Sequence, residues 1–301
     1  MVQFGTAGVR GSVVDRVTPT VALAVGQAVG RLVTESPPPD RSPPAVVIGR
    51  DGRTSGPALA AAVEAGVASA GARPVRIGQV PTPTLAYASR GRHGVMLTAS
   101  HNPPTDNGIK CFADGSEFDR DQERRIEDFV DSETPPTDWD RWQSPTQIDP
   151  LPDYLEAVAD YSRGFGAALN DLRIAVDCGT GMASVATPAV LDSLGASVTA
   201  VNASVDGHFP ARPSKPTPET LAEFRSFLQD GTFDLGIAHD GDADRIVILD
   251  GDGEIVHEDT ILAILAGYYT RQYAAEHGET APTPVVVTTP NASGRIDEQV
   301  T

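Results

Sequence analysis

Short apolar segments of strand type alternate with longer helical segments along this chain, and this alternation limits the possible folds more than any other feature. Strands are expected at 45–49, 75–77, 94–97, 173–178, 197–201, 235–238 and 246–249, and helices over 18–33, 57–71, 183–194 and 218–228. Strands separated by helices need right-handed crossovers, which cover both faces of a mainly parallel or mixed sheet. The expected fold class is α/β, with serial three-layer α/β/α domains.

A segment rich in Pro, Asp, Thr and Trp at 132–152 interrupts the pattern and is the expected domain boundary. With 301 residues the chain is long enough for two or three compact units. We expect a first domain at 1–135, a second at 152–252 and the incomplete start of a third at 257–301. The third would open with a helix over 259–275 and a strand from 284.

The charge of the chain argues against several kinds of partner. Its net charge is -18, whereas a protein that binds nucleic acid needs a basic surface. No run of about 18 apolar residues and no basic leader is present, so we expect no membrane span and a cytoplasmic location. Only Lys110 and Lys215 are lysines, and an acidic surface poor in lysine suggests a halophilic protein.

The first candidate site follows the expected strand at 94–97. Thr-Ala-Ser-His-Asn-Pro and then Asn-Gly-Ile-Lys form a constrained loop that exposes Ser100. His101 is a candidate base and Lys110 a cation in the same loop, which suits a nucleophilic hydroxyl. The alternative is that Ser100 and Asn102 only cap a turn.

The second candidate site is the acidic sequence His-Asp-Gly-Asp-Ala-Asp-Arg. Asp240, Asp242 and Asp244 alternate in an expected extended loop, so that three carboxylates can converge on one hard cation, for which Mg²⁺ is the natural choice. A calcium loop of the EF-hand type is excluded, because its sixth and twelfth positions would be Arg245 and Gly251. A solvated acidic turn remains the alternative.

Glycines and arginines form a third group of candidates. The glycines of Gly-Thr-Ala-Gly-Val-Arg-Gly at 5–11 permit close approach of a ligand, and Arg10 offers a forked donor for phosphate. Arg50 and Arg53 follow a strand, at the edge where α/β sheets bind ligands. Surface ion pairing is the alternative for these two arginines.

These motifs, taken together, resemble the α-D-phosphohexomutase superfamily, which includes phosphoglucomutases, phosphomannomutases and phosphoglucosamine mutases. The resemblance covers residues 1 to about 255 and rests on three sequences in order: Phe-Gly-Thr-x-Gly-x-Arg-Gly, Thr-Ala-Ser-His-Asn-Pro with Asn-Gly-Ile-Lys, and Asp-Gly-Asp-x-Asp-Arg. The segment 206–212 is similar to the family's second-domain loop.

The resemblance implies a role for each site residue. Ser100 would be a phosphoserine that shares an essential Mg²⁺ with Asp240, Asp242 and Asp244. Lys110 would be a general acid or base, with its pKa lowered by a nearby cation and partial burial. His101 would orient the reactants, and Arg10 and Arg245 match arginines that line the reacting phosphate. Arg50, Arg53 and Asn102 are the further phosphate or substrate contacts that we expect.

The implied reaction moves a phosphoryl group between O1 and O6 of a hexose or hexosamine phosphate through a 1,6-bisphosphate. Family members have four domains, so we expect the fourth domain, with its phosphate clamp, and the sugar-reading loop of the third to be absent. Asn-Ala-Ser-Gly-Arg at 291–295 is interpreted as third-domain sequence. A possible partner is therefore a missing C-terminal half, and turnover by this chain alone should be very weak or nil.

Three questions stay open at this level. The sugar can be glucosamine, mannose or glucose 6-phosphate. A non-catalytic remnant or metal-binding module is the main alternative function. A phosphatase of the haloacid-dehalogenase type, with Asp240 as nucleophile and Asp242 as acid, is a further alternative, but it leaves Ser100, Lys110 and Arg10 without a role.

Overall fold

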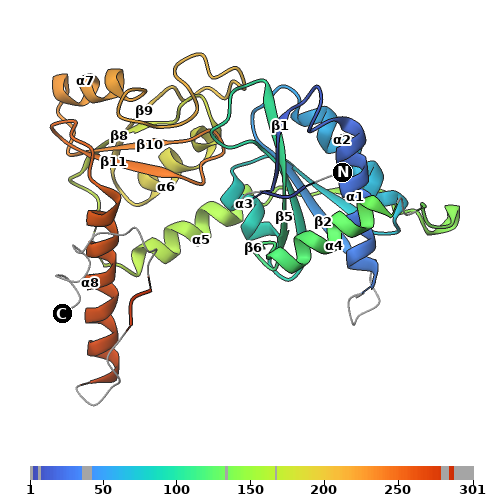
Figure 1. The fold of residues 1–301 in the computed structure, drawn as a ribbon. Helices are drawn as coiled ribbons and strands as arrows, with labels where there is room; N and C mark the ends of the chain where they lie inside the picture. The colour runs from blue at the N-terminus through green and yellow to red at the C-terminus, as the bar shows by residue number, and fades with distance from the viewer. Residues whose placement is uncertain are drawn as a thin grey trace.

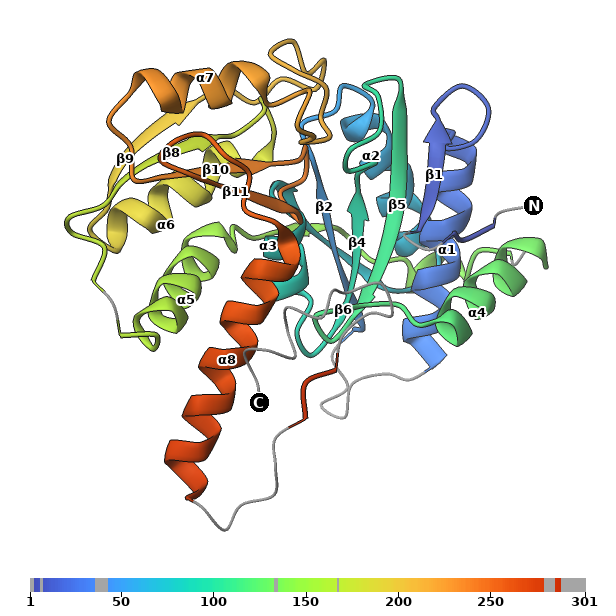
Figure 2. The same cartoon turned by 60° about the vertical axis from the view of Figure 1, so that its left-hand side comes forward.

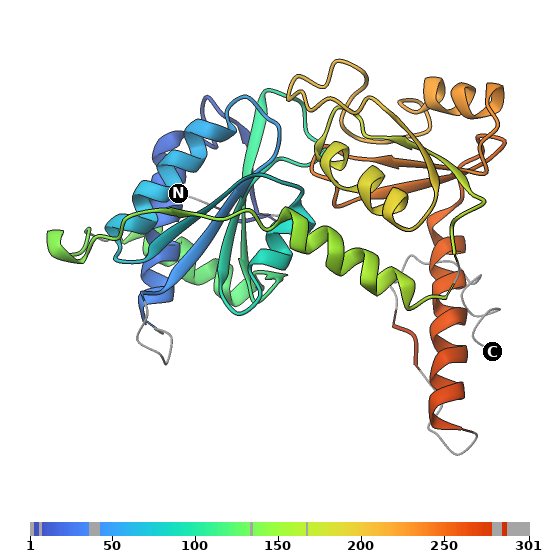
Figure 3. The same ribbon diagram turned by 180° about the vertical axis from the view of Figure 1, so that it is seen from behind.

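The chain folds into two α/β units that lie side by side, as a computed structural model shows (Figure 1). Helix α5 (Leu151–Arg163) lies between the units, and α8 (Glu258–His277) extends away from the second sheet (Figure 3). The structure describes residues 3–5, 8–35, 43–132, 135–166, 168–278 and 285–287.

The first sheet is mixed and has the strand order β1-β5-β4-β2-β3-β7, with β6 paired to β5. Strands β4, β2, β3 and β7 run parallel, whereas β5 is antiparallel to both of its main neighbours. The strands are β1 (Val9–Ser12), β2 (Ala45–Arg50), β3 (Arg73–Gln79), β4 (His93–Leu97), β5 (Asp106–Ala113), β6 (Ser116–Glu117) and β7 (Thr146–Gln147).

Helices cover both faces of this sheet, because side chains along each strand alternate between two apolar cores. Val46 and Ile48 pack in one core with α1 (Pro19–Glu35), α2 (Gly56–Ser69) and α4 (Arg120–Asp131). Val47 points into the other core, against α3 (Thr82–Ala88). Helices α1 and α2 lie in close contact, since a Cβ on Gly66 would stand 2.2 Å from the Leu23 carbonyl oxygen.

The second sheet has the order β11-β10-β8-β9, with β10, β8 and β9 parallel and β11 antiparallel. One face packs on α6 and the other on α7, as the view in Figure 2 shows. Its elements are β8 (Arg173–Asp177), the 3-10 helix η2 (Met182–Val185), α6 (Thr187–Ser193), β9 (Ser197–Val201), α7 (Ala222–Asp230), β10 (Leu235–His239) and β11 (Ile246–Asp250).

The expected fold class is confirmed, with differences in detail. The helix expected over 183–194 is broken at Ala186 (φ -130°, ψ -67°), because Pro188 has no N–H to continue the hydrogen bonding and so lies in the first turn of a new helix. Within the expected domain boundary, β7 pairs with β3 and so extends the first sheet; a 3-10 helix (Trp139–Arg141) precedes it.

The expected third unit is described only in part. Helix α8 is present, and residues 285–287 follow it without strand pairing. The rest of the expected strand from 284, and the sequence at 291–295, lie outside the described residues. Among the helices that the structure describes, none combines the length and apolar character that crossing a bilayer requires.

Candidate active site

The two candidate loops meet because both follow parallel strands at their carboxyl ends, where α/β sheets place their binding sites. Strand β4 leads into the Ser100 loop and β10 into the aspartate loop. The expectation that the loop exposes Ser100 is wrong, because Ser100 is completely buried and donates a hydrogen bond from Oγ to Oδ2 of Asp240 at 2.6 Å. A hydroxyl of the first unit thus touches a carboxylate of the second, 140 positions later.

The three aspartates converge as the spacing predicted. Ligand oxygens of Asp240, Asp242 and Asp244 all lie within 4.8 Å of one another. The expectation that this loop is extended is wrong, however. The backbone forms a turn, in which Ala243 has a φ of +59° and its N–H donates to the Asp240 carbonyl at 3.3 Å. The turn, and not an extended strand, brings the carboxylates together.

Thr82, at the start of α3, holds the central aspartate from the first unit. Its hydroxyl donates to Asp242 Oδ2 at 2.6 Å, and its N–H donates to the Asp242 carbonyl at 3.0 Å. The other carboxylate oxygen, Oδ1, is buried and has no hydrogen-bond partner among the described residues. A buried oxygen without a partner carries a large desolvation cost unless a cation or donor binds it.

The electrostatics of the aspartate loop also fit a divalent cation. Burial raises the pKa of Asp240 to about 7, and the charges of Asp242 and Asp244 contribute. A cation placed among the three carboxylates would remove this repulsion, and hard oxygen donors are what Mg²⁺ prefers. Asp240, Asp242 and Asp244 are therefore suited to hold Mg²⁺.

Lys110 lies on β5, not in the loop where the sequence pattern placed it. Its Nζ is 2.6 Å from Asp244 Oδ2, 3.3 Å from Glu117 Oε1 and 3.7 Å from Asp242 Oδ2. Burial acts to lower the pKa of Lys110, but the three carboxylates outweigh burial and the pKa is raised. The lowered pKa was expected from a nearby cation and partial burial; the groups in contact with Nζ are carboxylates, and with these alone Lys110 is an ammonium.

Arg53 is completely buried, and its guanidinium is fully used inside the protein. Nε donates to Asp51 Oδ2, Nη1 to the carbonyls of Pro103 and Asp106, and Nη2 to those of Ser100 and Asn102. These contacts satisfy all five guanidinium N–H groups. The geometry therefore favours a role in holding the Ser100 loop over the expected contact with substrate.

We predict that Arg53→Met lowers the free energy of unfolding by about 3–5 kcal/mol, because it leaves the Asp51 carboxylate buried without its counter-ion and several carbonyls without donors. Urea unfolding followed by circular dichroism measures this change. The control is Arg76→Ala, which removes a half-exposed ion pair with Glu64 and should cost less than about 1 kcal/mol. Equal effects of the two variants would contradict the buried role.

The remaining predicted phosphate ligands differ in their surroundings. Arg10, on β1, has a buried Nε without a hydrogen-bond partner among the described residues, which leaves this donor for an anion. Arg245 is 47% exposed, and its Nε is 3.9–4.0 Å from carboxylate oxygens of Asp244 and Asp240. Within the same glycine-rich loop as Arg10, residues 6 and 7 lie outside the described part of the chain.

Two of the expected ligands have other contacts. Arg50 donates to the Asp51 carbonyl at 3.2 Å and lines a separate cavity of about 280 Å³. The side-chain amide of Asn102 donates to Asp106 Oδ2 at 3.0 Å, within the Ser100 loop. The described contacts thus give neither residue a direct link to the aspartates.

His101 lies beside the hydroxyl of Ser100, with Nδ1 3.3 Å from Oγ. Burial lowers the pKa of His101, and the positive charges of Arg245, Arg10 and Lys215 lower it further. The imidazole is therefore neutral at neutral pH and can exchange a hydrogen bond with the hydroxyl.

Ser100 itself has an unusual backbone conformation. Its φ is +51°, a region that costs a residue other than glycine roughly 1–2 kcal/mol. Its N–H donates to Thr98 Oγ1 at 2.9 Å, and the Thr98 hydroxyl donates to Asp51 Oδ2 at 2.7 Å. The sequence pattern did not reveal this supporting role of Asp51 and Thr98, because both contacts depend on the packing of separate strands.

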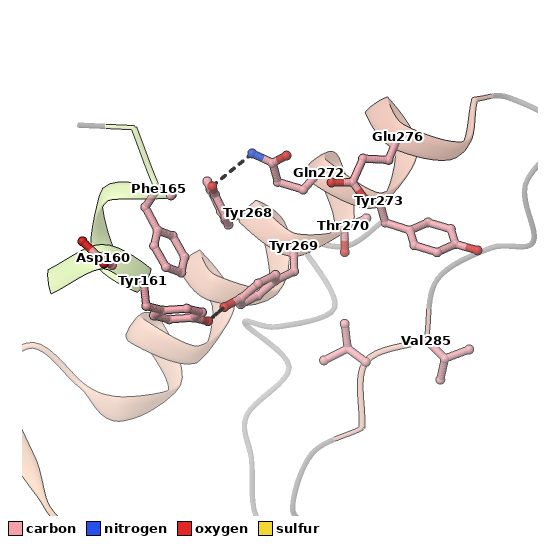
Figure 4. A pocket seen from close by; sticks show the side chains of 12 residues that line it. Asp160, Tyr161, Phe165, Tyr268, Tyr269, Thr270, Gln272, Tyr273, Glu276 and Val285 are labelled. Atoms are coloured by element: carbon pink, nitrogen blue, oxygen red, sulfur yellow. Dashed lines mark hydrogen bonds between the residues drawn. The ribbon is translucent and has the colours of Figure 1, made fainter. Parts of the chain in front are cut away.

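A large cavity, of about 750 Å³, lies elsewhere (Figure 4). It lies between α5 and α8 and contains an aromatic cluster in which the hydroxyls of Tyr161 and Tyr269 are 2.7 Å apart, next to Phe165. Ser100 and the three aspartates do not line it. The candidate active site is therefore the contact between the two loops and not this cavity.

Several curated proteins are similar to this chain in sequence. A phosphopentomutase from Thermococcus kodakarensis is 41% identical over 99% of this chain and 62% of its own length. A phosphoglucosamine mutase from Frankia alni is 42% identical over 95% of this chain and 63% of its own length. This chain thus spans less than two thirds of either relative.

Solved structures are similar to this chain in fold. A phosphoglucomutase/phosphomannomutase family protein from Burkholderia thailandensis superposes with a TM-score of 0.82 at 27% identity, over 100% of this chain and 65% of that one. A putative phosphomannomutase from Thermus thermophilus superposes with a TM-score of 0.78 at 27% identity, over 90% of this chain and 62% of that one.

Two family models match the units that carry the candidate loops. They are described as phosphoglucomutase/phosphomannomutase α/β/α domain I, which matches residues 1–137, and domain II, which matches residues 152–253. The Ser100 loop lies in the first match and the aspartate loop in the second. On this evidence the chain belongs to the phosphoglucomutase/phosphomannomutase family, within the α-D-phosphohexomutase superfamily.

Proposed function

We propose that this chain carries the phosphoryl-transferring part of a sugar phosphomutase, in which Ser100 is the phosphoserine and the three aspartates bind Mg²⁺. The contact of Ser100 Oγ with Asp240 Oδ2 at 2.6 Å is the observation that carries the proposal. It brings a candidate nucleophile to a carboxylate cluster with an unpartnered oxygen on Asp242. Membership of the family supports the same assignment.

The reaction we propose moves a phosphoryl group in two transfers. In the first, the bond between phosphorus and Ser100 Oγ breaks, a bond from phosphorus to a sugar hydroxyl oxygen forms, and the proton of that hydroxyl passes to Ser100 Oγ. The product is a bisphosphate. In the second, the bond between phosphorus and the other sugar oxygen breaks, Ser100 Oγ takes that phosphoryl group and gives up its proton, and the released sugar oxygen takes up a proton. For a hexose or hexosamine, the net result is transfer between O1 and O6 through the 1,6-bisphosphate.

The residues of the site match the needs of this chemistry, which are mainly positioning and neutralisation of charge. Bound Mg²⁺ would neutralise charge on the phosphoryl oxygens. The Nε of Arg10, which has no hydrogen-bond partner in the part of the chain that the structure describes, and the half-exposed Arg245 are suited to bind phosphate oxygens. Lys110, an ammonium with a raised pKa, is suited to donate the proton in the second transfer, and neutral His101 can orient the Ser100 hydroxyl.

The substrate we propose is a phosphorylated sugar. The relatives are named for glucosamine and for pentose phosphates, so the candidates are hexosamine, hexose and pentose phosphates. Because this chain spans 62% of the phosphopentomutase, we propose that residues outside it contribute to sugar recognition and that its own mutase turnover is very weak. Phosphoryl transfer to Ser100 is the activity expected of the chain itself.

The proposal is tested by measuring whether the chain takes up a phosphoryl group covalently. Incubated with glucose 1,6-bisphosphate and Mg²⁺, the chain should gain the mass of one phosphoryl group, and excess chelator should prevent the gain. Intact-mass spectrometry measures both results. If the chain gains no mass with either this bisphosphate or a bisphosphorylated glucosamine or pentose, the proposed function is wrong.

Mg²⁺ binding should depend on pH with a definite sign. Because the pKa of Asp240 is raised to about 7, this carboxyl is mostly protonated in moderate acid, and the cation must displace its proton. We therefore predict that Mg²⁺ raises the melting temperature more at about pH 8 than at about pH 5.5. Differential scanning fluorimetry, with potassium chloride of equal ionic strength as the control, measures the difference. A shift of the same size at both pH values would contradict this assignment.

A further inference from the structure

Ser214 connects the two halves of the proposed site. It lies in the segment between β9 and α7, which extends toward the first unit (Figure 2), and it is 4% exposed. Its Oγ donates to the Ser100 carbonyl at 2.8 Å and accepts the N–H of Gly241 at 3.1 Å. Because Gly241 stands between Asp240 and Asp242, one hydroxyl links the nucleophile's backbone to the backbone of the aspartate loop.

The backbone around Ser214 is anchored independently of its hydroxyl. Arg212 is buried, and its Nε donates to Asp177 Oδ2 at 2.6 Å while Nη2 donates to the His239 carbonyl at 2.7 Å. Upstream, a Cβ on Gly207 would stand 2.3 Å from the Gly52 carbonyl oxygen, so this segment lies directly against the first unit. Removal of the Ser214 hydroxyl should therefore leave the loop in place.

The backbone of Ser100 needs such support. Its φ of +51° is held while its carbonyl accepts two hydrogen bonds, from Arg53 Nη2 at 3.0 Å and from Ser214 Oγ at 2.8 Å. The contact with the aspartate loop is tight, since a Cβ on Gly241 would lie 2.7 Å from Ser214 Oγ and 2.8 Å from the Ser100 carbonyl oxygen. Arg53 belongs to the first unit, so Ser214 is the donor to this carbonyl from the second.

We propose that Ser214 is a positioning residue that aligns the Ser100 hydroxyl with the aspartate loop, an inference that rests on the proposed function. The two hydrogen bonds that the structure describes for the Ser214 hydroxyl are with backbone atoms of the two loops. It therefore acts on the rate through geometry, and a displacement of about 1 Å at a reacting atom can slow a reaction about a hundredfold. Substrate binding should not depend on it.

The test compares Ser214→Ala with Ser69→Ala, a matched control that removes another buried hydroxyl, bonded to the Gly66 carbonyl at 2.9 Å. The rate constant for phosphorylation of Ser100 is measured by quenched intact-mass spectrometry over a range of glucose 1,6-bisphosphate concentrations at saturating Mg²⁺. For Ser214→Ala we expect the maximal rate constant to fall about tenfold or more, with the half-saturating concentration within about twofold of wild type. Ser69→Ala should stay within about twofold in both.

Each outcome has a definite meaning. A Ser214→Ala rate constant equal to that of Ser69→Ala would overturn the inference, and so would a loss that vanishes when rates are normalised to the folded fraction from circular dichroism. An increase in half-saturating concentration alone would also overturn it, because it would make Ser214 a substrate contact. If wild type gains no phosphoryl group from glucose 1,6-bisphosphate or from a bisphosphorylated glucosamine or pentose, the proposed function fails, and this inference fails with it.

Discussion

Ser100→Ala should abolish the gain of a phosphoryl group completely under conditions in which the wild-type chain gains one. The physical reason is that the variant lacks the oxygen that forms the new bond to phosphorus, which is also the hydroxyl that lies 3.3 Å from His101 Nδ1. Intact-mass spectrometry of the whole chain, followed by peptide mapping of the 98–110 segment, measures the loss and locates the wild-type modification.

The matched control for this experiment is Ser193→Ala, which removes an exposed hydroxyl at the end of α6. It should gain a phosphoryl group as fast as wild type. A Ser100→Ala chain that is still phosphorylated would place the nucleophile elsewhere. The same outcome would favour the haloacid-dehalogenase alternative only if the phosphate mapped to Asp240.

Asp242→Asn should slow the phosphorylation of Ser100 about a hundredfold or more. Asp242 is completely buried, and its Oδ1 is the carboxylate oxygen without a partner among the described residues, so the variant removes a charge where a cation is expected. The amide oxygen can still accept the hydrogen bond of the Thr82 hydroxyl. The fold should therefore remain, and Mg²⁺ should no longer raise the melting temperature.

Asp252→Asn is the matched control, because Asp252 lies in the exposed acidic turn after β11. It should leave both the phosphorylation rate and the Mg²⁺ shift unchanged. If Asp242→Asn behaves in the same way, the aspartate loop is a buried structural turn and not a metal site. If wild type shows the Mg²⁺ shift without any phosphoryl gain, the chain is the metal-binding module without turnover that the sequence left as an alternative.

The elements with continuous apolar runs could be predicted from the sequence, whereas those with a weaker pattern could not. Strands β2, β4, β8 and β10 are mostly buried, so their apolar residues are contiguous and visible. Helix α4 fully buries only Ile126, with Phe129 and Val130 partly buried against the core, and helix α5 fully buries only Ala159. Charged residues interrupt the apolar residues of both helices, so neither contains a continuous apolar run that stands out in the sequence.

Roles that depend on burial and on distant neighbours were beyond the sequence. Arg53 resembles a phosphate ligand in its motif, but burial directs its five N–H groups to Asp51 and the Ser100 loop. Lys110 was expected to have a lowered pKa, whereas Asp244, Glu117 and Asp242 raise it. An electrostatic environment is a sum over charges in space, and spacing along the chain does not determine that sum.

By itself, the sequence determined the α/β class and the chemical groups of the two candidate loops, because strand periodicity and the spacing of three aspartates are local properties. Only the tertiary structure decided that the Ser100 hydroxyl meets Asp240, and that Ser214 joins the two loops. Ser100 and Asp240 are 140 positions apart in the chain, and Ser100 and Ser214 are 114 positions apart. They meet because two separately formed sheets pack with the carboxyl ends of their strands together.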